Sequence, residues 1–187
     1  MRRLLSAALL LCVAMAASAQ EMGISTNVVD YLTAGSLNVE ASYGFARHWS
    51  VSAGGKYSPL PSGKSILPAS DDTALLRQRL FNAGLRWWPW HIYSGWWMGA
   101  KLQYQEFVEK GRTGPETTEG DRFGGGLAAG YSAMLAPRFN LDLGLGLWGG
   151  YALYTKYACR SCGRRIDSGS RPFFLPSDLL LGITYIF

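Results

Sequence analysis

The last nine residues, 179–187, alternate between large apolar side chains and smaller or polar ones. Successive side chains of a β-strand point to opposite faces, so this segment predicts a strand with one bulky apolar face and one narrow mixed face. The apolar face holds Leu179, Leu181, Ile183, Tyr185 and Phe187. In a soluble barrel such a face points inward, whereas in a barrel surrounded by lipid it points outward.

The same alternation recurs along the chain and predicts eight strands. They are expected from about residue 22, then at 37–45, 49–57, 74–88, 92–107, 121–135, 139–156 and 179–187. Tight turns near residues 47, 90 and 137 alternate with longer links, of which 59–73, 108–120 and 157–176 are the longest, and all eight prolines fall in expected loops or turns. Even strand numbers with short turns at one end and long loops at the other are typical of outer-membrane barrels. The sequence therefore predicts an all-β, eight-stranded antiparallel up-and-down transmembrane β-barrel.

Charged residues orient the expected strands, because they share the polar face. An Arg or Lys facing lipid near the bilayer midplane costs about 2–4 kcal/mol, and a one-residue slip would expose them all. We therefore expect a lumen charge network in which Glu40 and Asp142 pair with Arg86, Lys56 or Lys101. Its expected members are Glu40, Lys56, Arg86, Lys101, Arg122 and Asp142. Eight strands leave an interior only wide enough for side chains, so a filled, non-conducting lumen and a monomer are expected.

The first residues read as an export signal. Arg2 and Arg3 precede an apolar run that ends in small residues near Ala19. This pattern predicts a cleaved signal peptide, 1–19, followed by one barrel domain, 20–187, and the run is shorter than the roughly 20 residues of a spanning helix. Without the two arginines the formal net charge falls from +5 to +3, too mild to indicate a nucleic-acid partner.

Aromatic residues support a membrane position. Tyr185 and the terminal Phe187 resemble the sorting signal that outer-membrane barrels present to their assembly machinery. Two interfacial girdles are expected, as in membrane barrels. The girdle near the short turns would hold Trp49, Trp87, Trp90, Trp96, Phe139 and Phe187, and the girdle near the long loops would hold Tyr57, Phe81, Tyr104, Phe123 and Tyr151.

Several local motifs together resemble a known family. The motifs are the segments 27–29 with 37–40, 47–51, 85–88, 124–126 and 142–154, and the Cys-x-x-Cys-Gly that ends at Gly163. They are similar to those of a Bacteroidota family of small outer-membrane barrel proteins of unassigned function. The resemblance implies an outer-membrane protein in contact with lipid and lipopolysaccharide, and a surface or fimbrial assembly protein as a candidate partner.

Catalytic chemistry has little support in the sequence, and no cofactor or metal is expected. A lipid A-modifying barrel enzyme is the sharpest alternative, but it needs a His or Ser beside a carboxylate near the outer leaflet. His48 and His91 lie in the expected turns at the other end, and Ser161, Asp167, Ser168 and Ser170 form no recognisable arrangement. A soluble lipocalin-type carrier is the other alternative, which would require the reverse assignment of the two faces.

The expected last loop carries the remaining candidate features. Arg160, Arg164, Arg165 and Arg171 form an outer basic loop that could contact lipopolysaccharide phosphates or an acidic partner, or could simply be solvated. Cys159 and Cys162 allow three interpretations: a redox motif, a zinc site or a local disulfide. A loop position disfavours the first and the lack of further ligands disfavours the second, so a disulfide is the preferred interpretation.

The disulfide can be tested by mass spectrometry. The mature chain purified without reductant should gain no mass on treatment with a thiol alkylator, and should gain two alkyl groups after reduction. Two alkylated thiols before reduction would exclude the disulfide.

Overall fold

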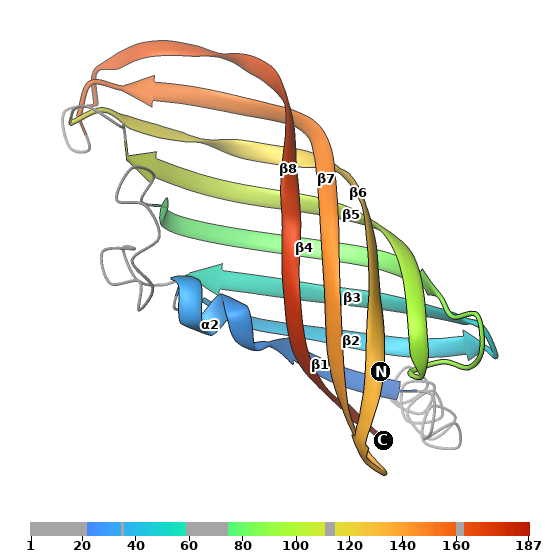
Figure 1. The fold of residues 1–187 in the computed structure, drawn as a ribbon. Coiled ribbons are helices and arrows are strands. Elements are labelled where there is room, and N and C mark those ends of the chain that lie inside the picture. Colours follow the sequence, from blue (N-terminus) through green and yellow to red (C-terminus); the bar gives the residue numbers. More distant parts are fainter. Residues whose placement is uncertain (1–21, 35, 59–74, 111–114, 160–162) are drawn as a thin grey trace, which may run out of the picture.

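A computed structural model describes residues 22–34, 36–58, 75–110, 115–159 and 163–187, so the expected signal peptide lies outside the described residues. The chain forms a closed antiparallel barrel in which each strand pairs with its neighbours in sequence and the last strand pairs with the first (Figure 1). The strands are β1 (Met22–Asn27), β2 (Leu37–Ala46), β3 (Trp49–Ser58), β4 (Leu75–Trp87), β5 (Gly95–Lys110), β6 (Thr117–Ala136), β7 (Phe139–Tyr157) and β8 (Arg165–Ile186). The predicted fold, an eight-stranded antiparallel up-and-down barrel, is confirmed.

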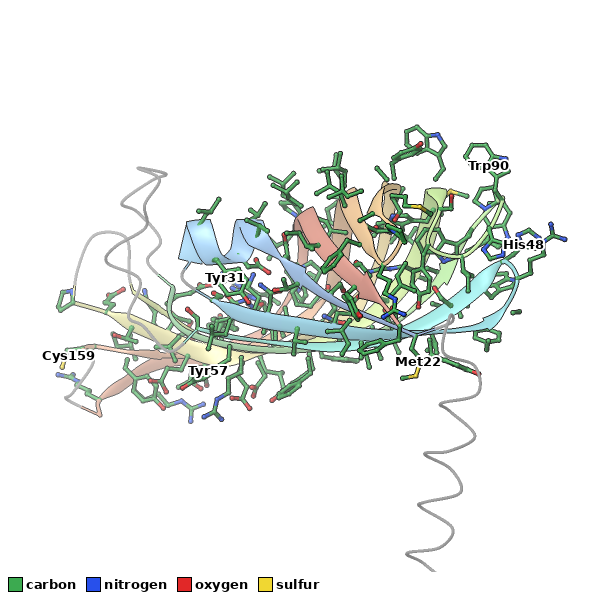
Figure 2. All side chains as sticks on the ribbon, turned by 90° about the horizontal axis from the view of Figure 1, so that it is seen from below. Met22, Tyr31, His48, Tyr57, Trp90 and Cys159 are labelled. Atoms are coloured by element: carbon green, nitrogen blue, oxygen red, sulfur yellow. The ribbon has the colours of Figure 1, made fainter. Side chains whose placement is uncertain are left out.

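The two faces of the wall differ as the alternation predicts. Leu102 and Leu127 are about 70% exposed on the outer face, while Gln103 and Asp142 are 3% exposed on the inner face. Many large apolar side chains lie on the outside, and Figure 2 shows side chains standing out along the whole barrel. The bulky face of the β8 segment 179–187 belongs to this outer surface.

Strand lengths are uneven, and this shapes one end of the molecule. β1 pairs with β8 only from Gly23↔Ile186 to Asn27↔Gly182, whereas β7 and β8 pair from Phe139↔Tyr185 to Tyr157↔Arg165. The barrel is therefore closed at the short-turn end, and the long strands β4–β8 continue beyond the ends of β1–β3 as a projecting sheet (Figure 1).

A short helix, α2 (Val28–Ala34), begins where β1 stops. The Asn27 side chain accepts hydrogen bonds from the backbone N–H of Val29, at 3.2 Å, and of Leu181, at 3.1 Å, and donates to the carbonyl of Leu179 at 3.1 Å. It thus caps the helix and adds a final link between β1 and β8. Within the described ranges, no helix is long and apolar enough to cross a membrane.

The expected loop 157–176 is largely strand, which corrects the sequence interpretation. β8 starts at Arg165 and contains Pro172 and Pro176, so the expectation that every proline lies outside the strands is also wrong. This part of β8 pairs with β7 alone because β1 is too short to reach it, and an edge strand tolerates proline.

A β-bulge interrupts the alternation of apolar and polar side chains in β8. Gly146 pairs with Asp178 and the next residue, Leu147, pairs with Pro176, so one extra residue is inserted in β8. On the C-terminal side of the bulge, even-numbered residues of β8 such as Thr184 lie on the inner face. On the N-terminal side, odd-numbered residues such as Phe173 lie on the inner face, because they pair with inner-face residues of β7.

Three other expected boundaries shift. The expected loop 108–120 is shorter, since β5 runs to Lys110 and β6 starts at Thr117. The expected link 30–36 is partly helical, because α2 occupies Val28–Ala34. Residues 92–94, expected to begin a strand, form a turn that enters the barrel instead.

That turn closes the short-turn end of the lumen. Trp88, Ile92, Tyr93 and Trp97 form a buried cluster, with Trp88 fully buried. The indole N–H of Trp88 donates to Ser50 Oγ at 2.9 Å, and the Tyr93 and Ser42 hydroxyl groups lie 3.0 Å apart. The polar tips of Trp88 and Tyr93 are therefore satisfied by serines of the polar face. We call the four-residue cluster the plug.

Glycines on the inner row of β6 provide the space for these rings. A Cβ atom placed on Gly130 would lie 2.2 Å from the backbone carbonyl oxygen of Leu143 and 2.6 Å from Trp97 Cζ2. A Cβ atom on Gly125, on the outer face of the same strand, would meet nothing closer than 3.8 Å. We expect Gly130→Ala to lower the free energy of unfolding by about 1–3 kcal/mol through overpacking. Gly125→Ala should leave it unchanged within about 0.5 kcal/mol.

Urea denaturation of the refolded protein measures both variants. Equal stability of the two would contradict the close approach of the β7 backbone and the Trp97 ring to Gly130.

Candidate functional site: the charged lumen

The inner face carries an ionic cluster near the middle of the barrel. Arg86 of β4 forms a salt bridge with Glu40 of β2 over the inner face of β3, and both side chains are largely buried. The Arg86 guanidinium also lies over the Trp97 ring, 4.7 Å from its centroid, so it is in contact with both the plug and the cluster. This pair is one of the combinations expected from the sequence.

A second pair lies where α2 meets the lumen. Lys56 of β3 pairs with Asp30 of α2 rather than with an acid of the barrel wall. Asp30 was not among the expected members, because the sequence placed it in a link between strands. The side chains are 19% and 15% exposed, so this pair lies at the boundary between the lumen and solvent.

A third pair lies toward the projecting sheet. Arg122 donates to Glu109 at 2.6 Å, and its guanidinium lies 3.8 Å from the centroid of the buried Phe107 ring. Glu109 was also missed, since it falls in the expected loop 108–120. The Trp148 and Phe173 rings, on the inner rows of β7 and β8, pack edge to face at 4.5 Å.

Asp142 differs from the other members. It is 3% exposed, and one carboxylate oxygen accepts a hydrogen bond from the Thr184 hydroxyl. Its Oδ1 atom has no hydrogen-bond partner, and no ion pair joins it to a cation in the part of the chain that the structure describes. The expected pairing of Asp142 with Arg86, Lys56 or Lys101 is therefore not seen.

A cavity of about 90 Å³ lies among these groups, so the lumen is not filled throughout. Lys101 lines it, together with both partners of the Arg86–Glu40 and Lys56–Asp30 pairs. Trp97 and Asp142 line it as well. The cavity thus brings together five of the six residues of the predicted network, and Arg122 lies apart with Glu109.

The predicted loop features lie at the far end from the plug. Figure 2 shows Cys159 at the opposite end of the molecule from His48 and Trp90. Cys162 and Arg160 lie outside the described residues, so the disulfide stays a prediction.

The described arginines of the predicted basic loop belong mainly to strand β8. Arg165 and Arg171 lie in β8 and Arg164 precedes it, so this cluster is the edge of a sheet and not a loop. Arg171 lies on the inner row above the bulge, opposite Ala152, with its guanidinium 5.4 Å from the Tyr154 ring centroid.

The projecting sheet carries surface ion pairs. Lys156 lies 2.6 Å from Glu116, and this hydrogen bond raises the pKa of the exposed Lys156 ammonium above its ordinary value. A raised lysine pKa favours the folded state at pH values below the ordinary pKa, and the contribution disappears as the pH rises through the folded-state value.

Each histidine contacts a backbone carbonyl group. His48 contacts the carbonyl of Trp88 at 2.8 Å and His91 contacts that of Ile92 at 3.3 Å, both at the short-turn end. Among the described residues there is no group of three or more His, Cys, Asp or Glu side chains that could hold a metal ion.

The C-terminal aromatic residues form a surface cluster at the same end. The Tyr185 ring lies 5.1 Å from both Phe139 and Phe187, and the Phe187 N–H donates to the Met22 carbonyl at 3.0 Å. These residues tie the end of β8 to the start of β1.

The energetic role of the central ion pair can be measured by a double-mutant cycle. Arg86→Met leaves the Glu40 carboxylate unpaired in the lumen, so we expect a loss of stability on the order of 3 kcal/mol. Glu40→Gln combined with Arg86→Met should recover much of this loss, because the carboxylate that lost its salt-bridge partner is removed as well.

The pair Arg79–Glu106 provides a matched control for this cycle. It lies 3.7 Å apart with both side chains nearly half exposed, and truncating it should cost about 0–1 kcal/mol. A cycle at Arg86–Glu40 that is as weak as this control would contradict the role of the lumen pair.

Comparison with known proteins identifies the family. Neither curated proteins nor solved structures gave a match. The model of a family described as "Protein of unknown function (DUF3575)" matches residues 5–187. The chain, an eight-stranded barrel with a charged lumen, therefore belongs to this family of unknown function.

Proposed function

We propose that the protein is a small, non-enzymatic outer-membrane barrel with a structural or surface-interaction role. It would be exported by a cleaved signal peptide, inserted by the barrel assembly machinery and surrounded by lipid and lipopolysaccharide as a monomer. Its projecting sheet would contact a protein of a surface or fimbrial assembly on the outer side.

The observation that carries this proposal is the distribution of polarity across the wall. Apolar side chains on the outer face, such as Leu145 and Phe123, are 65% or more exposed. The network charges, by contrast, lie on the inner face. Such an arrangement is unfavourable in water, where exposed apolar surface promotes association, and favourable in a bilayer.

The same distribution disfavours a lipocalin-type carrier. Such a barrel needs an apolar interior for its ligand and a polar exterior. Here the interior contains ion pairs such as Arg86–Glu40, and the outer surface carries aromatic side chains at both ends, for example Trp90 and Tyr151, both about 60% exposed.

The projecting sheet supports the surface-interaction part of the proposal. The β8 edge carries Arg165 and Arg171, which match the phosphate groups of lipopolysaccharide or an acidic protein surface. Its prolines and charges also discourage indiscriminate pairing with other strands. Side-chain recognition is therefore a better model for this edge than strand addition.

Native membranes provide the direct test. The protein should fractionate with the outer membrane, and mild crosslinking should recover a specific surface-assembly partner. Substituting Arg165 and Arg171 by Gln should weaken that recovery, while the same substitution of Arg138, at the short-turn end, should not. Recovery in the soluble periplasmic fraction would reject the membrane location, and an unchanged partner yield from the Gln variant would reject the arginine contact.

Lipid exposure of the outer face can be tested with two leucines of β6. Leu127 lies in the middle of the strand and Leu135 near the turn, and they are 70% and 63% exposed. Leu127→Arg should destabilise the protein in lipid vesicles by about 2–4 kcal/mol, and Leu135→Arg by only about 0–1 kcal/mol.

Urea titration in vesicles gives both free energies of unfolding. A soluble barrel would tolerate the two substitutions equally well, so equal and small effects would contradict the proposal.

A further inference from the structure

We propose that the short-turn end of the barrel binds the phosphate groups of anionic phospholipids through Arg47 and Arg138. Both arginines lie in tight turns, Arg47 between β2 and β3 and Arg138 between β6 and β7. Figure 2 shows this end, marked by His48 and Trp90, opposite the end that carries Cys159. The inference rests on the membrane location proposed above, and it adds a lipid preference at the end of the barrel away from the projecting sheet.

Arg47 and Arg138 are exposed bases without an ion-pair partner among the described residues. Five other basic residues each pair with a carboxylate: Lys56, Arg79, Arg86, Arg122 and Lys156. A guanidinium group that is not engaged in an ion pair offers planar N–H donors that match the oxygens of a phosphate group. The two turns therefore present free anion-binding groups at the surface.

Exposed acidic side chains lie at the other end of the molecule. Within the described ranges they are Glu119, Asp121 and Asp167, on the loop-side parts of β6 and β8. At the short-turn end the described residues contribute the terminal carboxylate of Phe187, and the sequence adds Glu21 before β1, outside the described residues. The attraction for phosphate therefore comes from the two unpaired arginines and not from the net charge of this end.

The turn of Arg47 is joined to the turn that carries Trp90. The Trp88 N–H donates to the His48 carbonyl at 2.9 Å, and His48 Nδ1 lies 2.8 Å from the Trp88 carbonyl oxygen. Trp90 is exposed, yet its ring packs against Gly95, where a Cβ atom would lie 2.5 Å from Trp90 Cε3. Because tryptophan is enriched at membrane–water interfaces, this ring would place Arg47 at the depth of the lipid headgroups.

Arg138 lies beside an aromatic cluster on the outer wall. Its Nη1 donates to the Tyr185 hydroxyl group at 3.3 Å, and its carbonyl accepts the Ile186 N–H at 2.9 Å. The centroid of the Tyr185 ring lies 5.1 Å from those of Phe139 and Phe187, which are both exposed. The guanidinium is therefore held toward the outer face of the wall, with further N–H donors left for a phosphate group.

A lipid headgroup fits these contacts better than a dissolved phosphate ion. A single exposed arginine binds a dissolved anion weakly, because water and salt screen its charge. At an anionic membrane surface, in contrast, each base strengthens binding about fivefold. The exposed rings beside both arginines also favour the interface of a bilayer over water.

Fluorescence quenching by brominated lipids measures the lipid preference at this end. The outward-facing tryptophans that report on it are Trp49, Trp87, Trp90 and Trp96. The mature chain would be refolded into vesicles that mix phosphatidylglycerol and phosphatidylcholine, with either one brominated. We expect phosphatidylglycerol to associate about fivefold more strongly at low salt, and this ratio to approach one in about 1 M sodium chloride. Both leaflets have the same composition, so the direction of insertion does not affect the result.

Two double variants with the same loss of charge locate the preference. Arg47→Gln combined with Arg138→Gln should reduce the ratio to about one, because both guanidinium groups at this end are removed. Arg165→Gln combined with Arg171→Gln provides the control, since it removes two charges from the opposite end and should leave the ratio unchanged.

The outcomes separate this inference from the membrane location. Equal quenching by the two brominated lipids would overturn the lipid preference alone, whereas no quenching by either would reject the membrane location and the preference with it. A ratio that falls equally in both double variants would assign the effect to net charge and overturn the role of the turns. If the turn variant does not refold, Arg47→Gln alone decides the question, because Arg47 is exposed in a turn and an unchanged ratio would contradict its contact with phosphate.

Discussion

The narrow interior of an eight-stranded barrel is the constraint on which the rest of this structure depends. Such a lumen has room for side chains only if large ones face small ones. Trp97 therefore lies across Gly130 and Gly144, and a Cβ atom on Gly126 would lie 2.8 Å from the Cβ atom of Trp148. Because the side-chain period of a strand is two, a one-residue slip would replace most of these glycines by larger outer-row residues such as Leu127, Ala129 and Leu143. The packing of two tryptophans thus helps to fix the register of β5, β6 and β7.

The narrow lumen also determines how the charged side chains are paired. Ionised groups that face inward are removed from bulk water, so each must find a partner within the barrel. Arg86 reaches across to Glu40, and Arg122 finds Glu109 and the Phe107 ring. Asp142 is satisfied on one oxygen only, by Thr184. The Arg86–Glu40 and Lys56–Asp30 pairs and Asp142 consequently line the same cavity.

Uneven strand lengths give the two ends of the barrel different characters. At the short-turn end, a turn folds inward and seals the lumen with the rings of Trp88 and Tyr93. At the other end β1 stops early, α2 takes its place beside β8, and the sheet β4–β8 continues without it (Figure 1). The Lys56–Asp30 pair joins the helix to the wall at this boundary. The two ends therefore differ: one is sealed by aromatic rings, and the other carries a helix and an extended sheet.

The sequence by itself determined the number of strands, their order and which face of each is apolar, because alternation with a period of two is a local property that neighbouring residues reveal. It also placed Glu40, Lys56, Arg86, Lys101, Arg122 and Asp142 on one face. It did not reveal the N-terminal half of β8, because a bulge inverts the alternation there and two prolines gave the segment the composition of a loop. Nor did it reveal Asp30 and Glu109 as charge partners, since the first was expected in a link and the second in a loop. Only the closure of the barrel decided these features, because closure sets which strands run out of neighbours and which side chains meet inside.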